Sequence, residues 1–156
     1  MKAIFILLLF NLVISYNNQK AAAYAKRYCR NFNPKYNSYA HKGPNCDCAN
    51  FVSQCLKEGG FDFSGCSTRD ELGMVYSSNT LRSCLDKKGW KKTKTPTRSF
   101  KEGYPIFNYD GPILHAMIAS SVYGKEILFC DHKIVGRCHL PLQDTSNKFE
   151  YYFLSL

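Results

Sequence analysis

The residues best suited to chemistry in this chain are a cysteine and a histidine that lie far apart in the sequence. Cys48 follows Asp47 where a predicted helix begins, and His115 opens a predicted β-strand. At the first turn of a helix, backbone N–H groups and the positive end of the helix dipole favour a thiolate over a thiol. A histidine facing that helix end could take the thiol proton, and the thiolate could then attack a carbonyl carbon. The N–H of Cys48 itself would hold the resulting oxyanion.

Each of the two residues also has a purely structural interpretation. Cys48 is one of eight cysteines and could be half of a disulfide. His115 could be a hydrogen-bonded histidine of the core. The residue types and their spacing alone leave both interpretations open.

The helix that would position Cys48 is the clearest element of the chain. Apolar residues recur at i, i+3, i+4, i+7 and i+8, the pattern of a helix with one buried face. We expect this helix to begin at Asp47 or Cys48, with Asp47 as its N-cap, and to end at Gly59-Gly60. The stripe consists of Cys48, Phe51, Val52, Cys55 and Leu56.

Other helices are predicted before the middle of the chain and strands after it. A first helix is expected over residues 18–31, a third helical region begins at a possible capping box of Thr68 and Glu71, and a fourth helix covers residues 81–88. Residues 91–98 form a polar run that we expect to be a long exposed loop. Helices followed by strands predict an α+β fold with an antiparallel sheet. The segments rich in β-branched and aromatic residues are 104–108, 114–122, 126–130 and 149–154.

The N-terminal residues are predicted to be a signal peptide. Lys2 precedes an apolar run over residues 3–10, and a polar stretch starts at Tyr16. The run is too short to cross a bilayer about 30 Å thick, which takes roughly 20 apolar residues. We therefore expect a signal peptide over residues 1–15, one domain over residues 16–156, and no membrane anchor. The mature protein would be a monomer, secreted or held in the lumen of the secretory–lysosomal pathway.

The charge balance is strongly basic. Lys and Arg number 21 against 12 Asp and Glu, giving a formal net charge of +9. Such a surface favours anionic partners, among them bacterial surfaces. The basic residues are scattered and no nucleic-acid motif is present, so we expect no nucleic-acid partner. A basic protein with no such partner remains the alternative.

Eight cysteines in an exported chain indicate disulfides, because the export pathway is oxidising. The C-x-C spacing of Cys46 and Cys48 lacks the second ligand pair of a zinc site, so we expect no metal and no cofactor. With Cys48 as nucleophile and Cys55 on the buried stripe, six cysteines remain for three disulfides. We favour pairing Cys130 with Cys138. The six are Cys29, Cys46, Cys66, Cys84, Cys130 and Cys138.

A third group should orient His115, and hairpin geometry narrows the choice to two neighbours. The strand of His115 reverses near Gly124-Lys125 and returns toward residue 132. A two-residue loop makes His132 the diagonal neighbour of His115, whereas a three-residue loop puts Asp131 there. Glycine first in a two-residue loop fits a type II′ turn, so we favour His132 and keep Asp131 as the alternative.

The stretch around Cys48 resembles a family signature. Residues 47–56, followed by residues 58–60, are similar to the D-C-T-N-F-V-S-Q-C-L-x-A-G-G pattern of the putative amidase domain family, with Ala49 and Glu58 departing from it. Residues 115–118 resemble the histidine strand of that family. Asp131-His132 resembles its later H-T segment, which also points to His132, although a lysine follows where threonine is usual.

The resemblance implies a papain-like, NlpC-type α+β fold and a Cys-His hydrolase that cleaves amide bonds by acyl transfer. The implied substrates are bacterial peptidoglycan or peptides. Within the motif, we interpret Asp47 as a helix cap and Asn50 as an amide that fixes a loop, with Ser53 and Gln54 in supporting positions. Two alternatives stay open: a catalytically inactive, basic, disulfide-rich protein that binds bacterial surfaces, and an enzyme with the same dyad that acts on other amides, such as protein side chains.

Overall fold

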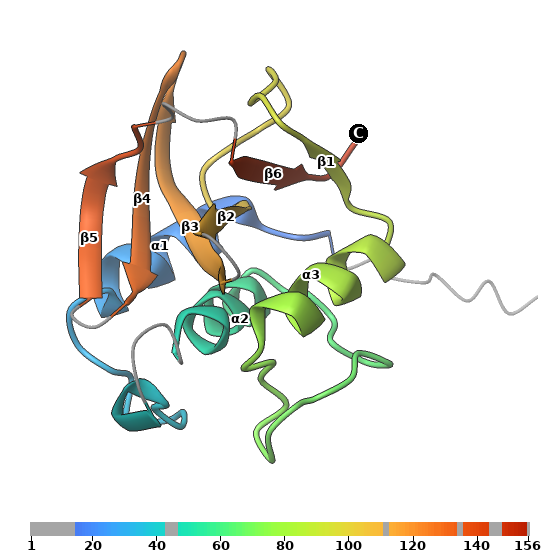
Figure 1. Cartoon of the computed structure of the whole chain (residues 1–156), viewed down its shortest axis with the longest axis vertical. Coiled ribbons are helices and arrows are strands. Elements are labelled where there is room, and N and C mark those ends of the chain that lie inside the picture. The colour runs from blue at the N-terminus through green and yellow to red at the C-terminus, as the bar shows by residue number, and fades with distance from the viewer. Residues whose placement is uncertain (1–14, 43–46, 111–112, 134–135, 144–147, 156) are drawn as a thin grey trace, which may run out of the picture.

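The computed structural model describes residues 15–42, 47–110, 113–133, 136–143 and 148–155. These residues form three α-helices, one short 3-10 helix and a six-stranded antiparallel sheet, which confirms the predicted α+β class (Figure 1). The predicted signal peptide lies almost entirely outside the described residues. None of the helices described is long and apolar enough to cross a membrane.

All the helices precede the sheet in the chain, and the short 3-10 helix lies between the first two α-helices. Their bounds are α1 (Asn18–Tyr28), η1 (Ala40–Lys42), α2 (Cys48–Glu58) and α3 (Ser78–Lys87). Asn17 caps α1, because its Oδ1 accepts the N–H of Lys20 at 2.9 Å. The predicted helices over residues 18–31, 47–58 and 81–88 are therefore confirmed with shifted ends.

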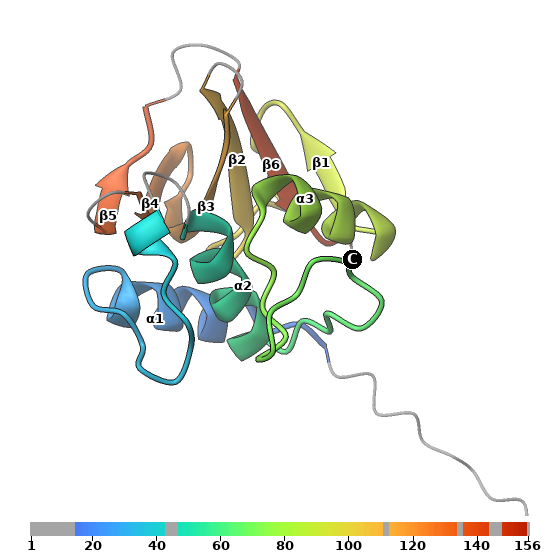
Figure 2. The ribbon, with the colours of Figure 1, turned by 60° about the horizontal axis from the view of Figure 1, so that its bottom comes forward.

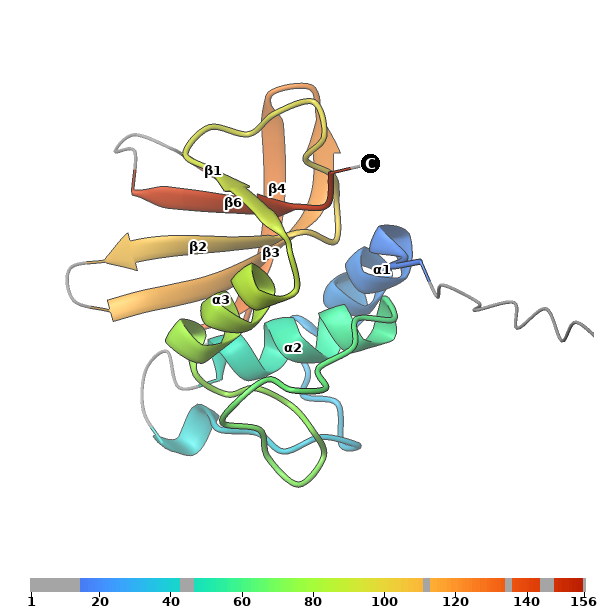
Figure 3. The same cartoon turned by 90° about the vertical axis from the view of Figure 1, so that its right-hand side faces the viewer.

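The sheet has the order β1-β6-β2-β3-β4-β5, and all of its paired strands are antiparallel. The helices gather on one side of it (Figures 2 and 3). The four predicted strands correspond to β2, β3, β4 and β6. The bounds are β1 (Lys91–Thr93), β2 (Pro105–Asp110), β3 (Ile113–Tyr123), β4 (Glu126–His132), β5 (Gly136–Pro141) and β6 (Phe149–Phe153).

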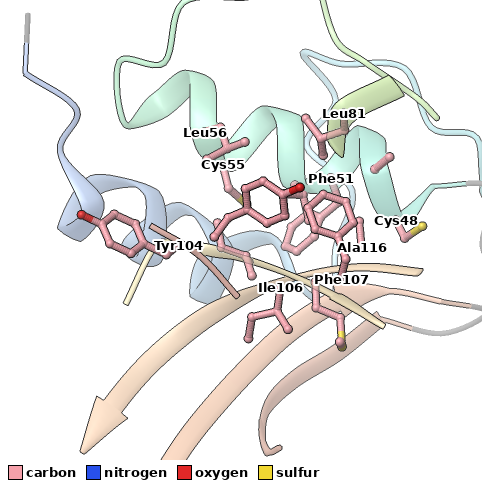
Figure 4. Packing of buried hydrophobic residues seen from close by; sticks show 14 of the residues in the cluster. Cys48, Phe51, Cys55, Leu56, Leu81, Tyr104, Ile106, Phe107 and Ala116 are labelled. Carbon is pink, nitrogen blue, oxygen red and sulfur yellow. The ribbon is translucent and has the colours of Figure 1, made fainter. Parts of the chain in front are cut away.

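The core lies between α2 and the centre of the sheet. Figure 4 shows the apolar stripe of α2 facing the side chains of β2 and β3. Phe51, Phe107 and Ala116 are all 0% exposed. Each large apolar side chain buried in this way contributes roughly 1.5–3 kcal/mol. The same packing fixes the N-terminus of α2, and with it Cys48, against β3.

Three features differ from the sequence-based predictions in the middle and C-terminal half. The capping box of Thr68 and Glu71 starts no helix, because Asp70 Oδ1 instead accepts the N–H groups of Leu72 and Met74 in a tight turn. The polar run after Trp90 is not all loop, since its first residues form β1 against β6. Strand β5 was not predicted, because its sequence has no regular apolar alternation.

The cysteine pairing also differs in part. Cys29 bonds Cys138 and Cys66 bonds Cys84, while Cys48, Cys55 and Cys130 are buried thiols. The predicted Cys130–Cys138 pair is therefore wrong. The β4–β5 ladder is irregular beside Cys130, whose sulfur accepts the N–H of His139 at 3.4 Å. Cys46 lies outside the described residues, so its pairing stays a prediction.

Candidate active site

Cys48 is the first residue of α2, as predicted, and its side chain is 1% exposed. The sulfur lies 3.3 Å from the hydroxyl oxygen of Ser78, the first residue of α3. The N–H groups in the first turn of an α-helix have no partner within the helix and point toward this end. The nucleophile candidate therefore lies where two helix N-termini meet.

Asp47 occupies the N-cap position of α2, but its carboxylate makes no capping hydrogen bond. Its Oδ1 accepts the N–H of Tyr39 at 2.7 Å and the side-chain amide of Asn50 at 2.9 Å. The expected helix-capping role of Asp47 is therefore wrong. The same Asn50 amide nitrogen donates to the carbonyl of Asn37 at 2.7 Å, so Asn50 fixes the preceding loop as predicted.

His115 lies on the half of β3 that has left β4. The β3–β4 pairing reaches Ile118 opposite Cys130, whereas β2 pairs with β3 through Asn108 opposite His115. His115 is buried, and its Nε2 lies 2.6 Å from Oδ2 of Asp131 on β4. The carboxylate therefore spans the gap between the two strands and orients the imidazole.

This contact corrects the predicted neighbour of His115. The turn has two residues, as expected, because Tyr123 faces Glu126. A bulge between Ala119 and Ser121 then shifts the register by one residue, which exchanges the two faces of β4 relative to β3. His132 is therefore not the residue that orients His115, and Asp131 takes that place.

His132 belongs to a second histidine–aspartate pair on the helix side of the sheet. Its Nδ1 lies 2.6 Å from Oδ2 of Asp47, and its Nε2 lies 2.9 Å from the carbonyl oxygen of Tyr28. The ring stacks on Phe51 with centroids 3.9 Å apart. Both ring nitrogens therefore lie beside oxygen atoms of the protein. His132 thus joins α1, α2 and β4.

The charges of Cys48 and His115 are coupled. Burial opposes the thiolate of Cys48, but the hydrogen bond and the charge of His115, together with the N–H of Ala116 and the hydroxyl of Ser78, lower its pKa overall. Burial likewise opposes the imidazolium of His115, but Asp131 and Cys48 raise its pKa to about 9. The fold therefore favours a thiolate–imidazolium pair.

The two nitrogens of His115 have different surroundings. Nε2 contacts the carboxylate of Asp131. Nδ1 is buried and makes no hydrogen bond of ordinary geometry within the part of the chain described. Nδ1 is thus the nitrogen left to exchange a proton with Cys48. Burial raises the pKa of Asp131, but its bonds to His115 and Arg137 lower it overall, so it is an anion beside the imidazole.

Arg137 is the site residue that the sequence analysis missed. Its guanidinium donates to the carboxylate of Asp131 through both Nε and Nη2, and its Nη2 lies 3.5 Å from Nε2 of His115. Arg137 faces Asp131 across the β4–β5 ladder. Only the recognition that β5 pairs with β4 could have pointed to Arg137. The sequence of β5 does not show that it forms a strand.

The remaining motif residues belong to the scaffold. Gln54 accepts the hydroxyl of Tyr24 at 2.7 Å, which ties α2 to α1. The hydroxyl of Ser53 lies 2.5 Å from the carbonyl oxygens of Ala49 and Val75. Among the described residues, no group of three or more metal-ligating side chains is placed to hold a metal ion.

One of three comparisons with known proteins found a match. The family described as putative amidase domain matches residues 15–109, which is more than half of the chain and includes Cys48. His115 and Asp131 lie beyond the matched segment. Searches of curated proteins and of solved structures found no match.

Proposed function

Because this chain belongs to the putative amidase domain family, whose description indicates an amidase-type hydrolase, we propose that it is a cysteine-dependent amide hydrolase. Cys48 is the nucleophile, His115 the general acid and base, and Asp131 the residue that orients His115. The observation that carries the proposal is geometric: a buried cysteine is the first residue of α2, and Asp131 holds the buried His115 at 2.6 Å from its Nε2. The lowered pKa of Cys48 and the raised pKa of His115 agree with this pairing. A cysteine and a histidine that served only the core would need no such pairing.

The reaction would proceed by acyl transfer. The Cys48 thiolate adds to the amide carbonyl carbon, and the N–H of Cys48 at the start of α2 stabilises the oxyanion. His115, protonated at Nδ1, gives that proton to the leaving nitrogen as the C–N bond breaks. Water then loses a proton to His115 and attacks the thioester, which releases the acid and regenerates the thiolate.

The proposed assignment separates two histidine–acid pairs by role. Asp131 acts on the reacting histidine, since it lies 2.6 Å from Nε2 of His115. His132 acts through Asp47 on the position of α2, and it contacts no reacting atom of the dyad. His132 is therefore a positioning residue.

The setting supports a secreted enzyme with a papain-like, NlpC-type domain. A nucleophile at the start of a helix packed on an antiparallel sheet is the arrangement expected of that fold. Two disulfides suit an oxidising compartment, and the net charge of +9 favours encounter with anionic bacterial surfaces. We propose peptidoglycan or its peptides as the substrate.

Incubation with purified peptidoglycan and mass analysis of the released fragments tests this function. Wild type should release fragments with newly formed carboxyl ends, and Cys48→Ala should release none. Cys55→Ala is the matched control, because it removes a second buried thiol from the same helix and should leave the activity in place.

The same experiment separates the alternatives. Equal release by Cys48→Ala would overturn the cysteine mechanism. Binding to peptidoglycan without release by wild type would identify an inactive binding protein. Release from synthetic peptides or from protein side-chain amides, but not from peptidoglycan, would identify the second enzymatic alternative.

A further inference from the structure

The hydroxyl oxygen of Ser78 lies 3.3 Å from the sulfur of Cys48, and both residues are buried. We propose that Ser78 is a further catalytic residue, whose hydroxyl donates a hydrogen bond to the oxyanion that forms when Cys48 attacks an amide carbonyl. The inference rests on the proposed function and adds a second donor to its oxyanion hole. The first donor is the N–H of Cys48 itself.

The charge of Cys48 decides which of the two atoms donates in the resting enzyme. A thiolate has no proton to give, so the hydroxyl of Ser78 must be the donor beside it. Burial opposes the thiolate, but this hydrogen bond, together with those of His115 and Ala116, lowers the pKa of Cys48 overall. Before the substrate reacts, the O–H of Ser78 therefore points at the sulfur.

Bond formation moves the negative charge to a new atom within reach of the same hydroxyl. As the C–S bond forms, the π electrons of the carbonyl move to its oxygen, and the sulfur becomes a neutral, weak acceptor. That oxygen is bonded to the carbon that the sulfur has attacked. An oxyanion donor lies about 2.7–3.1 Å from this position. A hydroxyl 3.3 Å from the Cys48 sulfur can reach it by rotating its O–H bond, and no proton is transferred.

An effective oxyanion donor must be held in place before the reaction, and α3 is anchored in three ways. Leu81, one turn after Ser78, is 0% exposed, and Figure 4 shows it among the side chains packed around α2. Arg82 binds Glu150 of β6 at 2.7 Å. Cys84 is half of a disulfide. These anchors fix the start of α3, and with it Ser78, relative to the sheet and to α2.

The motif residue Ser53 joins the segments that carry Cys48 and Ser78. Its hydroxyl oxygen lies 2.5 Å from the carbonyl oxygen of Ala49, the residue after Cys48. It also lies 2.5 Å from the carbonyl oxygen of Val75, three residues before Ser78. Ser53 is fully buried in α2. It is therefore a positioning residue that keeps the Ser78 hydroxyl beside the nucleophile.

Two small reagents separate an effect on the oxyanion from an effect on the thiolate. Iodoacetamide is attacked at a saturated carbon, so no oxyanion forms. p-Nitrophenyl acetate is attacked at its carbonyl carbon, which forms an oxyanion and then releases p-nitrophenolate. Both reactions need the thiolate. The ratio of the ester rate to the iodoacetamide rate at Cys48 therefore does not depend on how much thiolate is present.

The two rates are measured on the full mature protein, and the rates of Cys48→Ala are subtracted. We expect Ser78→Ala to lower the ratio about tenfold, less than the roughly 100-fold that loss of an oxyanion donor costs with unactivated substrates. Ser78→Gly, which also lacks the hydroxyl, should lower it similarly. Ser77→Ala is the matched control, because the side chain of Ser77 makes no capping hydrogen bond and its loss should leave the ratio unchanged.

The labelling of Cys55 reports folding in the same samples, because this thiol is fully buried and should stay unlabelled in a folded variant. A ratio equal to that of wild type in a folded Ser78→Ala or Ser78→Gly would overturn the inference, even if both rates fell, since Ser78 would then serve the thiolate alone. Failure of the proposed function looks different. In that case wild type and Cys48→Ala would react equally with the ester.

Discussion

His132, on the same strand as the proposed orienting residue, contacts Asp47, the residue just before the proposed nucleophile. Their side chains meet at 2.6 Å between Nδ1 and Oδ2, with both side chains buried. The same ring reaches the carbonyl of Tyr28 at the end of α1. Two elements, α1 and β4, therefore fix the start of α2, and the position of Cys48 depends on a contact that has no part in the proposed chemistry.

Replacing His132 by alanine should strongly destabilise the protein. The change leaves the buried Asp47 carboxylate without its main partner, and breaking a buried pair in this way costs about 3–5 kcal/mol. Urea unfolding measures the loss. His139→Ala is the control, since His139 is exposed and bonds Ser120 at 2.9 Å; it should cost much less. Similar stabilities for the two variants would contradict the proposed role of His132.

Replacing Asp131 by asparagine should lower kcat and change its pH dependence. Asp131 and Cys48 raise the pKa of His115 to about 9, so the alkaline limb of kcat/KM for wild type should fall near that pH. Without the carboxylate, the limb should move to lower pH. An unchanged limb in Asp131→Asn would show that the carboxylate does not act on His115.

The sequence predicted the elements with strong periodicity and the places of the two candidate site residues on them. The stripe of α2 and the β-branched runs of β2, β3, β4 and β6 are long enough to identify helix and strand without tertiary information. Cys48 and His115 follow from their places at the starts of α2 and β3. The weakly patterned strands β1 and β5 were missed. Because Arg137 lies on β5, it was missed as well.

The identity of the orienting residue could not be predicted, for a specific physical reason. The turn at Gly124 has the expected two residues, but the bulge before Ser121 adds one residue to β3 and exchanges Asp131 for His132. No residue near Ser120 marks a bulge by type. The helix expected at the capping box of Thr68 was wrong for a similar reason. The turn that forms instead at Asp70 is built from residues whose types do not distinguish it from a helix start.

Cys48 should react with iodoacetamide faster than the other buried thiols below pH 9. Burial opposes the Cys48 thiolate, but the hydrogen bond and charge of His115 lower its pKa overall from the ordinary 9.0, whereas burial raises the pKa of Cys55 and of Cys130. Mass mapping of labelled peptides gives the three rates. In His115→Ala the advantage of Cys48 should largely disappear. Equal labelling of the three thiols in wild type would contradict the assignment of the nucleophile.

The two disulfides should contribute unequally to stability. Cys29–Cys138 spans a sequence separation of 109 residues and Cys66–Cys84 one of 18. On the chain-entropy account, the longer loop contributes about 4–5 kcal/mol and the shorter about 3 kcal/mol. Unfolding of the two double-alanine variants measures the difference. A larger loss on removing Cys66–Cys84 would show that native packing, and not loop length, decides the contribution.

Gly103 should tolerate alanine far less well than Gly124, although both adopt positive φ, at +77° and +61°. A Cβ at Gly103 would lie 1.9 Å from the carbonyl oxygen of Asn18, whereas a Cβ at Gly124 meets nothing within 4 Å. Gly124→Ala should therefore cost only the backbone strain, about 1–2 kcal/mol. Gly103→Ala must also push the start of α1 away from the sheet, which places it among the rare substitutions that cost about 4 kcal/mol or more. Urea unfolding of the two variants measures both costs. Equal costs would show that α1 can move away from the sheet without penalty, and the carbonyl of Tyr28 would then be a poor anchor for His132.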